Sequence, residues 1–189
     1  MKPTPFAALI AAGIGLVALG DVVAPIVFAQ SPPPTKGDVI YVPTPPSVVD
    51  AMLQVAAVTE RDVVYDLGSG DGRIVIAAVK QYGARGVGIE IDPVPLRMAV
   101  YRARRAGVED RVRFVRGDLF EADIGEATVV TLFLFETLNR RLLPKLLREL
   151  APGTRIVAHR YGFGDAWPPE RTVQAGASTL YLWTVPKRK

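Results

Sequence analysis

Residues 63–72 read VVYDLGSGDG, and this stretch decides how the chain folds. Its first five residues are mostly apolar and β-branched, which predicts a buried strand over 63–67. The glycines that follow predict a tight turn, and residues 73–82 have the spacing of a helix. Glycines at such a turn permit a positive φ and let backbone N–H groups approach a ligand at the N-terminus of the helix. The turn is therefore either a ligand-binding loop or a plain strand-to-helix connection.

The same alternation of strand and helix continues outward from this turn. Further strands are predicted at 86–91, 112–115, 128–135 and 155–158, and further helices at 47–58, 96–105 and 140–150. Apolar strands that alternate with helices predict an α/β fold with a doubly wound, mostly parallel, Rossmann-like sheet. The last two strands, 171–175 and 179–185, meet at Gly176 and alternate in polarity, which predicts an antiparallel hairpin and a total of seven strands.

Local signals refine three of these elements. Thr44 is a plausible N-cap for the first helix, with Pro45 at its first position. Pro144 must fall in the first turn of its helix or kink it. The connections after the third and fifth strands are short and leave little room for a full helix in either place.

Composition excludes several classes of protein. The chain has 189 residues, 49% of them hydrophobic and 22% charged, which suits one folded domain and excludes general disorder. With no cysteine and a single histidine, disulfides, thiolate zinc sites and cysteine nucleophiles are excluded, and no metal site is predicted. The net charge of +4 is mildly basic. The seven arginines in residues 97–116 suit a surface for nucleic acid or anionic lipid, or a solvated helix face, and we favour the solvated face.

The N-terminal part differs from the rest of the chain. Residues 6–29 are apolar except for Asp21 and are long enough to cross a bilayer, so they predict a hydrophobic helix that is either an uncleaved membrane anchor or a signal segment cleaved after Ala29. Residues 30–46 contain six prolines and predict an extended spacer. The predicted organisation is thus an anchor or signal at 1–29, a linker at 30–46 and a catalytic domain at 47–189.

Acidic residues near the predicted strand ends identify a ligand. Glu90 lies 22 positions after Gly68, where a carboxylate can accept hydrogen bonds from two ribose hydroxyls, and Asp118 is placed to accept from an adenine amino group. Arg73 stands where a dinucleotide fingerprint requires its third glycine. The carboxylate of Asp66 is a poor neighbour for pyrophosphate but suits a ligand with an ammonium and a sulfonium, which describes S-adenosylmethionine.

With these residues, the chain from Tyr41 onward resembles class I methyltransferases of seven β-strands, which use S-adenosyl-L-methionine. The resemblance implies that the donor is bound by Thr44, Asp66, Gly68, Ser69, Gly70, Gly72, Glu90, Asp118 and Leu119. Within this role Thr44 is expected to reach the methionine carboxylate. More narrowly, YVPTP at 41–45, the loop at 66–73, and Arg160 with WP at 167–168 resemble bacterial relatives of the mitochondrial lysine methyltransferases that act on the ADP/ATP carrier and the ATP synthase c-subunit.

The narrower resemblance implies a protein-lysine N-methyltransferase that acts on a membrane-associated protein. The chain departs from those relatives after its fourth strand, where it reads FLFET at 133–137 and lacks an expected proline. Candidates for the acceptor pocket are Glu136, His159, Tyr161 and Trp167, although each also suits a plain structural role.

Other functions stay open at this point. A small-molecule methyltransferase is disfavoured by the short acceptor loops, and a non-catalytic nucleoside-binding module is disfavoured by the complete glycine loop. A nucleic-acid partner is disfavoured because the chain has no Asn- or Asp-Pro-Pro-Tyr motif after the fourth strand. Because the methyl donor is made inside cells, we expect a retained anchor and a cytoplasmic catalytic domain; export after cleavage at Ala29 is the alternative.

Overall fold

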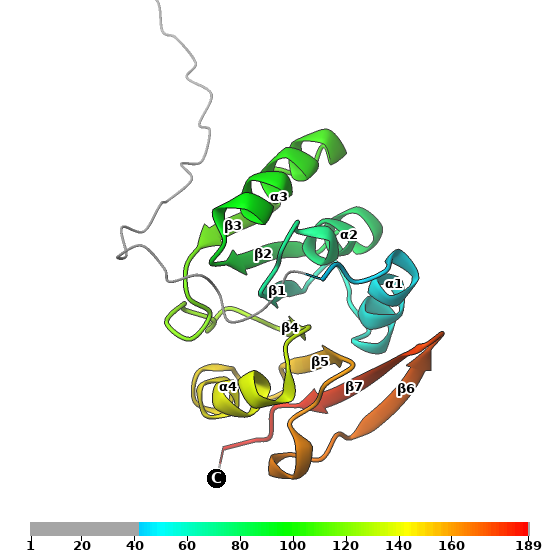
Figure 1. Ribbon diagram of the computed structural model, residues 1–189, viewed down its shortest axis with the longest axis vertical. Coiled ribbons are helices and arrows are strands. Elements are labelled where there is room, and N and C mark those ends of the chain that lie inside the picture. Colours follow the sequence, from blue (N-terminus) through cyan, green and yellow to red (C-terminus); the bar gives the residue numbers. More distant parts are fainter. Residues whose placement is uncertain (1–41, 189) are drawn as a thin grey trace, which may run out of the picture.

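The computed structural model describes residues 42–188, which form one mixed seven-stranded sheet flanked by helices (Figure 1). The strands lie in the order β3-β2-β1-β4-β5-β7-β6. Neighbours among the first five in this order pair in parallel, and β7 pairs antiparallel with both β5 and β6. Their bounds are β1 Val63–Leu67, β2 Arg85–Glu90, β3 Val112–Arg116, β4 Val129–Leu132, β5 Arg155–His159, β6 Arg171–Ala175 and β7 Ser178–Thr184. The mostly parallel sheet and its C-terminal antiparallel pair are as predicted.

Four α-helices cover the two faces of this sheet, namely α1 Pro46–Val55, α2 Arg73–Tyr82, α3 Pro93–Ala106 and α4 Glu136–Glu149. The first three pack on one face, because Val64 of β1 shares a core cluster with buried residues of α1 and α2, and α3 packs beside α2. Tyr65 points to the opposite face and packs in the cluster that holds the leucines of α4. Alternation along β1 thus builds both halves of the core.

The start of α1 corrects the predicted cap. Pro45, not Thr44, is the N-cap residue, Pro46 is the first helical residue, and no side chain caps the helix. Thr44 cannot cap because it lies one residue too early, and its side chain is buried. The helix also ends at Val55, short of the predicted residue 58, because the backbone at Ala57 turns to a positive φ of 49°.

The predicted limits around β4 and α4 are wrong. β4 ends at Leu132, not at residue 135, and α4 begins at Glu136, not at residue 140. The chain leaves the sheet early, so the apolar residues after β4 line a cavity instead of extending the strand. With this earlier start Pro144 lies inside the helix and not in its first turn. Because proline has no N–H, the carbonyl of Arg140 receives no helical hydrogen bond from this position.

Two connections at the carboxyl ends of the parallel strands are short. Residues 117–128, between β3 and β4, contain no helix, and only the 3₁₀ turn Gly164–Ala166 lies between β5 and β6. Both observations confirm the expected lack of full helices there. The carboxyl ends of the parallel strands are therefore bordered by loops.

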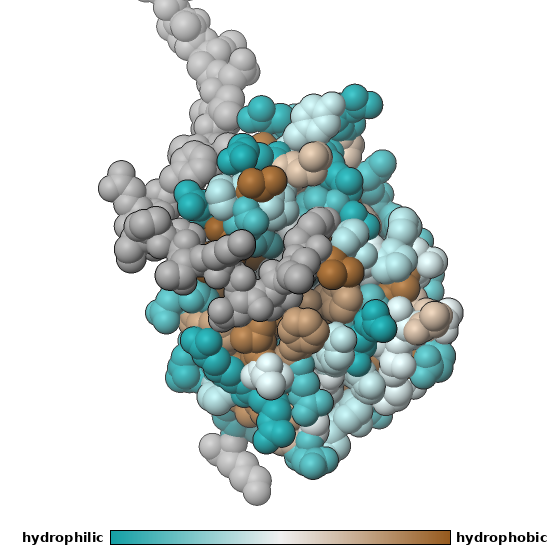
Figure 2. Space-filling model, in the orientation of Figure 1, coloured by the Kyte–Doolittle hydropathy of each residue, from teal (hydrophilic) through white to brown (hydrophobic). Residues whose placement is uncertain are grey.

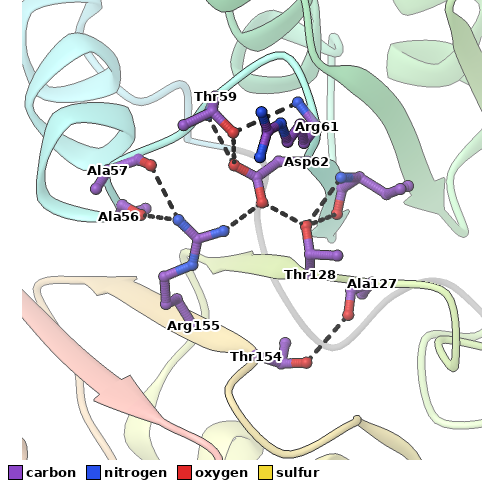
Figure 3. Close-up of polar contacts among 10 residues, drawn as sticks. Ala56, Ala57, Thr59, Arg61, Asp62, Ala127, Thr128, Thr154 and Arg155 are labelled. Atoms are coloured by element: carbon purple, nitrogen blue, oxygen red, sulfur yellow. Dashed lines mark hydrogen bonds and ion pairs between the residues drawn. The ribbon is translucent and has the colours of Figure 1, made fainter.

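A polar network closes the opposite, amino end of the sheet (Figure 3). Asp62, immediately before β1, accepts hydrogen bonds from Thr59 and Thr128 and forms an ion pair with Arg155 at the start of β5. Arg155 also donates to the backbone carbonyl of Ala56 at 2.6 Å. The network joins the end of α1 to three strands.

The predicted hydrophobic segment at 6–29 and most of the predicted linker lie outside the described residues. The described residues begin within that linker at Val42. The last residue of the predicted linker, Pro46, is the first residue of α1. Within residues 42–188, no helix combines the length and the apolar character needed to span a membrane.

Candidate cofactor and acceptor site

A cavity of about 580 Å³ opens at the carboxyl ends of the parallel strands. This is the position at which ligands bind in open α/β sheets, and the volume suits a small molecule. Of the predicted donor-binding residues, the cavity is lined by Thr44, Asp66, Gly68, Ser69, Glu90, Asp118 and Leu119. Figure 2 shows hydrophobic surface near the carboxyl end of β4, beside the atoms drawn in grey.

The glycine loop forms one wall of this cavity. Gly68 has a φ of +85°, and a Cβ atom there would lie 3.2 Å from a methyl carbon of Leu134. The backbone conformation therefore favours glycine, and a side chain at this position would also press on Leu134. The hydroxyl of Ser69, which is buried, has no hydrogen-bond partner among the described residues.

Gly70 and Gly72 are not among the residues that line the cavity. Gly70 donates its N–H to Glu90, and so supports the site from behind. At Gly72 an added Cβ would lie 2.5 Å from the ring of Phe114 and 2.9 Å from Ala99. Gly72 thus lets the loop pack closely against β3 and α3.

Asp66 is a buried carboxylate in the cavity wall. It is the fourth residue of β1, is 3% exposed, and accepts a 2.8 Å hydrogen bond from Thr131 of β4. Burial, helped by the negative charges of Glu90 and Asp71, raises the pKa of Asp66 to about 7 against the lowering effect of the Thr131 hydrogen bond. A cationic ligand nearby would favour the ionised form.

Glu90 ends β2 with both carboxylate oxygens held in place. One oxygen accepts the N–H of Gly70 at 2.8 Å, and the other accepts the N–H of Asp92 at 2.8 Å. Each oxygen retains a lone pair that can accept a further hydrogen bond. The carboxylate is therefore oriented by backbone groups to receive two hydroxyl donors.

The far end of the cavity lies beyond β3. Asp118 accepts the N–H of Phe120 at 2.9 Å, which shapes the turn, and Leu119 lies between them. The guanidinium carbon of Arg141 lies 3.9 Å from the centre of the Phe120 ring. This cation–π pair joins α4 to the loop after β3 and adds a flat wall to the cavity.

An ionic network that the sequence did not predict secures the segment before α1. Arg73 forms an ion pair with Asp71 at 2.7 Å and donates to the carbonyl of Thr44 at 2.8 Å. Asp71 also pairs with Arg102 of α3 at 2.7 Å. Arg73, which argued against a dinucleotide fingerprint, thus ties the glycine loop to the chain at Thr44, and its adjacency to the loop was the only signal.

The aromatic and aliphatic wall was also missed. Phe133, Leu134 and Leu138 follow β4 and line the cavity together with Phe120. In the sequence these residues continue an apolar run, which is why the pattern predicts a longer strand. The available signal was FLFET itself, where the sequence lacks the proline that the resemblance led us to expect.

None of the four predicted acceptor residues is among those that line this cavity. Glu136 is half exposed and lies 3.9 Å from Arg140 in an ion pair. The ring of Tyr161 packs on Phe135, at 5.4 Å between centroids. Trp167 stacks on Phe163, and its carbonyl accepts the indole N–H of Trp183.

His159 lies directly behind the cavity wall. Its ring centroid is 4.1 Å from that of Phe133, and its Nε2 is 2.9 Å from the hydroxyl of Ser178. Burial, together with the charge of Arg160, lowers the pKa of His159 to about 4. The imidazole is therefore neutral near pH 7 and supports Phe133 from the β5 side.

These groups fit S-adenosylmethionine. A buried carboxylate, a glycine turn with an unpartnered hydroxyl, and an oriented glutamate provide in one cavity what a ligand with an ammonium, a carboxylate and a ribose requires. A family model described as the ANTKMT methyltransferase domain matches residues 66–171, from the glycine loop to the first residue of β6. The chain belongs to this family.

Two curated relatives cover most of the chain. A protein-lysine N-methyltransferase from Saccharolobus islandicus is 44% identical over 154 residues, which are 79% of this chain and 95% of the relative. An ATP synthase C-subunit lysine N-methyltransferase from Xenopus laevis is 35% identical over 178 residues, which are 93% of this chain and 76% of the relative. The related enzyme from mouse is matched over only 49% of its length.

A solved structure supports the same assignment. The crystal structure of an RNA methyltransferase from Salinibacter ruber in complex with S-adenosyl-L-homocysteine is 56% identical, with a TM-score of 0.76 over 78% of this chain and 96% of that chain. A SAM-dependent methyltransferase from Geobacter sulfurreducens, also in complex with S-adenosyl-L-homocysteine, has a TM-score of 0.57 at 27% identity. This ANTKMT-family chain is a methyltransferase that depends on S-adenosylmethionine.

Proposed function

We propose that this methyltransferase transfers a methyl group from S-adenosylmethionine to the side-chain amine of a lysine in a membrane-associated protein. The observation that carries the proposal is the 44% identity to the protein-lysine N-methyltransferase of S. islandicus, which extends over 95% of that enzyme. The Xenopus and mouse relatives are lysine N-methyltransferases of the ATP synthase C-subunit, which is a membrane protein.

The geometry of the site is compatible with this reaction. The donor supplies an activated methyl group, so the chain has to align donor and acceptor and exclude water. The new bond forms between the neutral lysine nitrogen and the methyl carbon as the carbon–sulfur bond breaks, and the nitrogen then releases its proton to solvent. The aromatic rings of Phe133 and Phe120 give the cavity an apolar wall past which an aliphatic lysine side chain can extend.

We further propose that residues 6–29 stay attached as a membrane anchor and that the catalytic domain is cytoplasmic. An exported domain would lack the donor, which is made inside cells. The anchor and the proline-rich linker would hold the catalytic domain near its substrate and raise the effective concentration of that substrate. N-terminal sequencing of the mature protein from fractionated cells tests this placement, and a soluble exported chain that begins at Gln30 would refute it.

RNA is the second candidate acceptor, because the 56% identical structure from S. ruber is that of an RNA methyltransferase. To test this, the purified full chain and labelled donor are incubated with membranes and with total RNA, both from a host that lacks this gene. Methyl-lysine in hydrolysed protein supports our proposal, whereas label confined to digested nucleosides would overturn it. Asp66→Asn should strongly reduce the label in both fractions when the donor is not saturating, and Asp110→Asn, at an exposed position away from the cavity, is the matched control.

A further inference from the structure

The outer face of α3 carries a stripe of exposed apolar side chains. Val94, Met98 and Tyr101 are 62%, 49% and 56% exposed. Their spacing of four and three residues places them on one side of the helix, opposite the buried Leu96 and Ala99. These three make up half of the six large hydrophobic side chains that are exposed in the part of the chain that the structure describes.

Arginines lie on both sides of this stripe. At 100° per residue, Arg97 and Arg104 fall on one side of it and Arg102 on the other, and Arg105 lies within it. Arg102 is paired with Asp71, and Arg105 donates to the hydroxyl of Tyr101 at 3.3 Å. The helix contains no acidic residue.

Two of these arginines have no counter-ion among the described residues. Arg97 and Arg104 are exposed, and within residues 42–188 neither of them forms an ion pair. A solvated helix face would normally mix charges of both signs on its exposed side. Unpaired guanidinium groups beside exposed valine, methionine and tyrosine form an amphipathic surface. In Figure 2 the surface over α3 likewise mixes hydrophilic and hydrophobic residues.

We propose that this face, formed by Val94, Arg97, Met98, Tyr101 and Arg104, docks the catalytic domain on an anionic lipid bilayer. Helices of this type place apolar side chains at the boundary of the acyl chains while their arginines reach the lipid phosphates. Val94 and Met98 favour lipid over nucleic acid, because a nucleic-acid surface combines its basic residues with stacking rings and polar groups. The proposal does not depend on which molecule accepts the methyl group.

Docking in this way would also orient the active site. α3 starts at the cavity, since Asp92 and Pro95 on either side of Val94 line it, and then runs back along the sheet away from the carboxyl ends of the strands (Figure 1). A bilayer against α3 would therefore lie along the strands. The cavity would open sideways at the height of the lipid headgroups, within reach of a lysine at the membrane surface.

The absence of cysteine from the chain allows a local test. A single cysteine placed by Met98→Cys in the full chain can carry a polarity-sensitive dye, and Leu147→Cys on α4, at a position that is also partly exposed, is the matched control. The proteins are mixed with vesicles of phosphatidylcholine and anionic phosphatidylglycerol that contain a lipid-bound quencher. We expect a blue shift and strong quenching at 98 and little change at 147, even if residues 6–29 insert. Equal responses at both positions would overturn the proposal.

Charge reversal tests the contribution of the arginines. Arg97→Glu with Arg104→Glu in the Met98→Cys chain should weaken the anionic-vesicle response by more than about tenfold, since each basic residue contributes on the order of a fivefold effect near such a surface. Arg61→Glu with Arg171→Glu changes the net charge equally at exposed positions off α3 and should leave the response unchanged. Equal losses in both double variants, or a dye response to RNA but not to vesicles, would refute lipid docking.

Discussion

Two buried aspartates at opposite ends of β1 have opposite electrostatic environments. Asp62, just before the strand, is 6% exposed, and Asp66, within its last two residues, is 3% exposed. Asp62 accepts from Thr59 and Thr128 and pairs with Arg155 (Figure 3). For Asp66 the described residues supply one side-chain donor, Thr131.

The partners and the depth of burial together separate the two carboxyl groups. Burial alone raises the pKa of Asp62, but the hydrogen bonds from Thr128 and Thr59 and the charge of Arg155 lower it below 3.8 overall. At Asp66 burial dominates and raises the pKa to about 7. A buried carboxylate whose partners are present stabilises the fold, and one whose partners are lacking is poised for a cationic ligand.

Removal of the Asp62 carboxylate should have the largest effect. Asp62→Ala leaves Arg155 and two hydroxyl donors without their acceptor, so we expect the free energy of unfolding at pH 7 to fall by about 3 kcal/mol. Urea denaturation measures the loss, and Asp110→Ala at an exposed position should change stability by less than about 0.5 kcal/mol. The affinity of the folded variant for S-adenosyl-L-homocysteine should be unchanged.

The pH dependence gives the same prediction a second test. Because the pKa of Asp62 is lowered by folding, its contribution is present above the ordinary value of 3.8 and is lost as the pH falls through the lower, folded-state value. The difference in stability between wild type and Asp62→Ala should therefore shrink in acid. A constant difference from pH 7 to pH 3 would show that the carboxylate does not act through its charge.

Asp66→Asn should have the opposite effect on stability and a large effect on binding. Without a buried charge, the cofactor-free variant should be about 2 kcal/mol more stable than wild type at pH 8. Its affinity for S-adenosylmethionine should fall at least about thirtyfold, the effect of one lost charged partner. Calorimetry measures the affinity, and unchanged affinity in the folded variant would remove Asp66 from the donor site.

The contribution of Asp66 to stability also depends on pH with the opposite sign to that of Asp62. Folding raises the pKa of Asp66 to about 7, so its favourable contribution is complete below the ordinary value of 3.8 and is lost as the pH rises through 7. The stability advantage of Asp66→Asn should therefore appear between about pH 4 and pH 7 and level off above the upper value. An advantage that is already complete at pH 4 would mean that packing, not charge, explains it.

Glu90 provides an intermediate case, because backbone N–H groups hold both of its oxygens. Glu90→Ala should lower the affinity for S-adenosylmethionine at least about tenfold through lost ribose hydrogen bonds, with a stability change below about 1 kcal/mol. A 2′,3′-dideoxy analogue should bind wild type and variant equally. If the analogue still distinguishes them, Glu90 has a role other than accepting from the ribose.

The glycine loop was the part of the molecule most fully encoded in local sequence. β1 and α2 have the bounds that were predicted, because a β-branched run, a glycine turn and an apolar helical stripe follow one another without ambiguity. Glu90 could be placed near the loop from the rule that carboxyl ends of parallel strands share an edge.

The residues that were missed depend on contacts distant in sequence. Arg73 reaches Thr44, 29 positions away, and Arg141 reaches the ring of Phe120. The apolar run after β4 could not be divided into strand and cavity wall, since both are hydrophobic. Likewise, Asp62 and Asp66 are both acids beside an apolar strand, and the partners and the depth of burial that distinguish them are set by the tertiary structure.

The smallest predicted effect isolates the hydrogen bond between Thr131 and Asp66. Thr131 is fully buried, so Thr131→Val keeps the shape of the side chain and removes the one donor to that carboxylate among the described side chains. Without it the pKa of Asp66 should rise further, and a smaller fraction should be ionised at pH 7. Since a cationic donor binds the ionised form, its affinity at pH 7 should fall by about threefold to tenfold, which is near 1 kcal/mol. At pH 9 the carboxylate is ionised in both proteins and the two affinities should converge. Calorimetric titrations at both pH values measure these affinities, and Asp66→Asn serves as the control for the ligand's own titration. If Thr131→Val lost as much affinity at pH 9 as at pH 7, the Thr131 hydrogen bond would not act through the ionisation of Asp66.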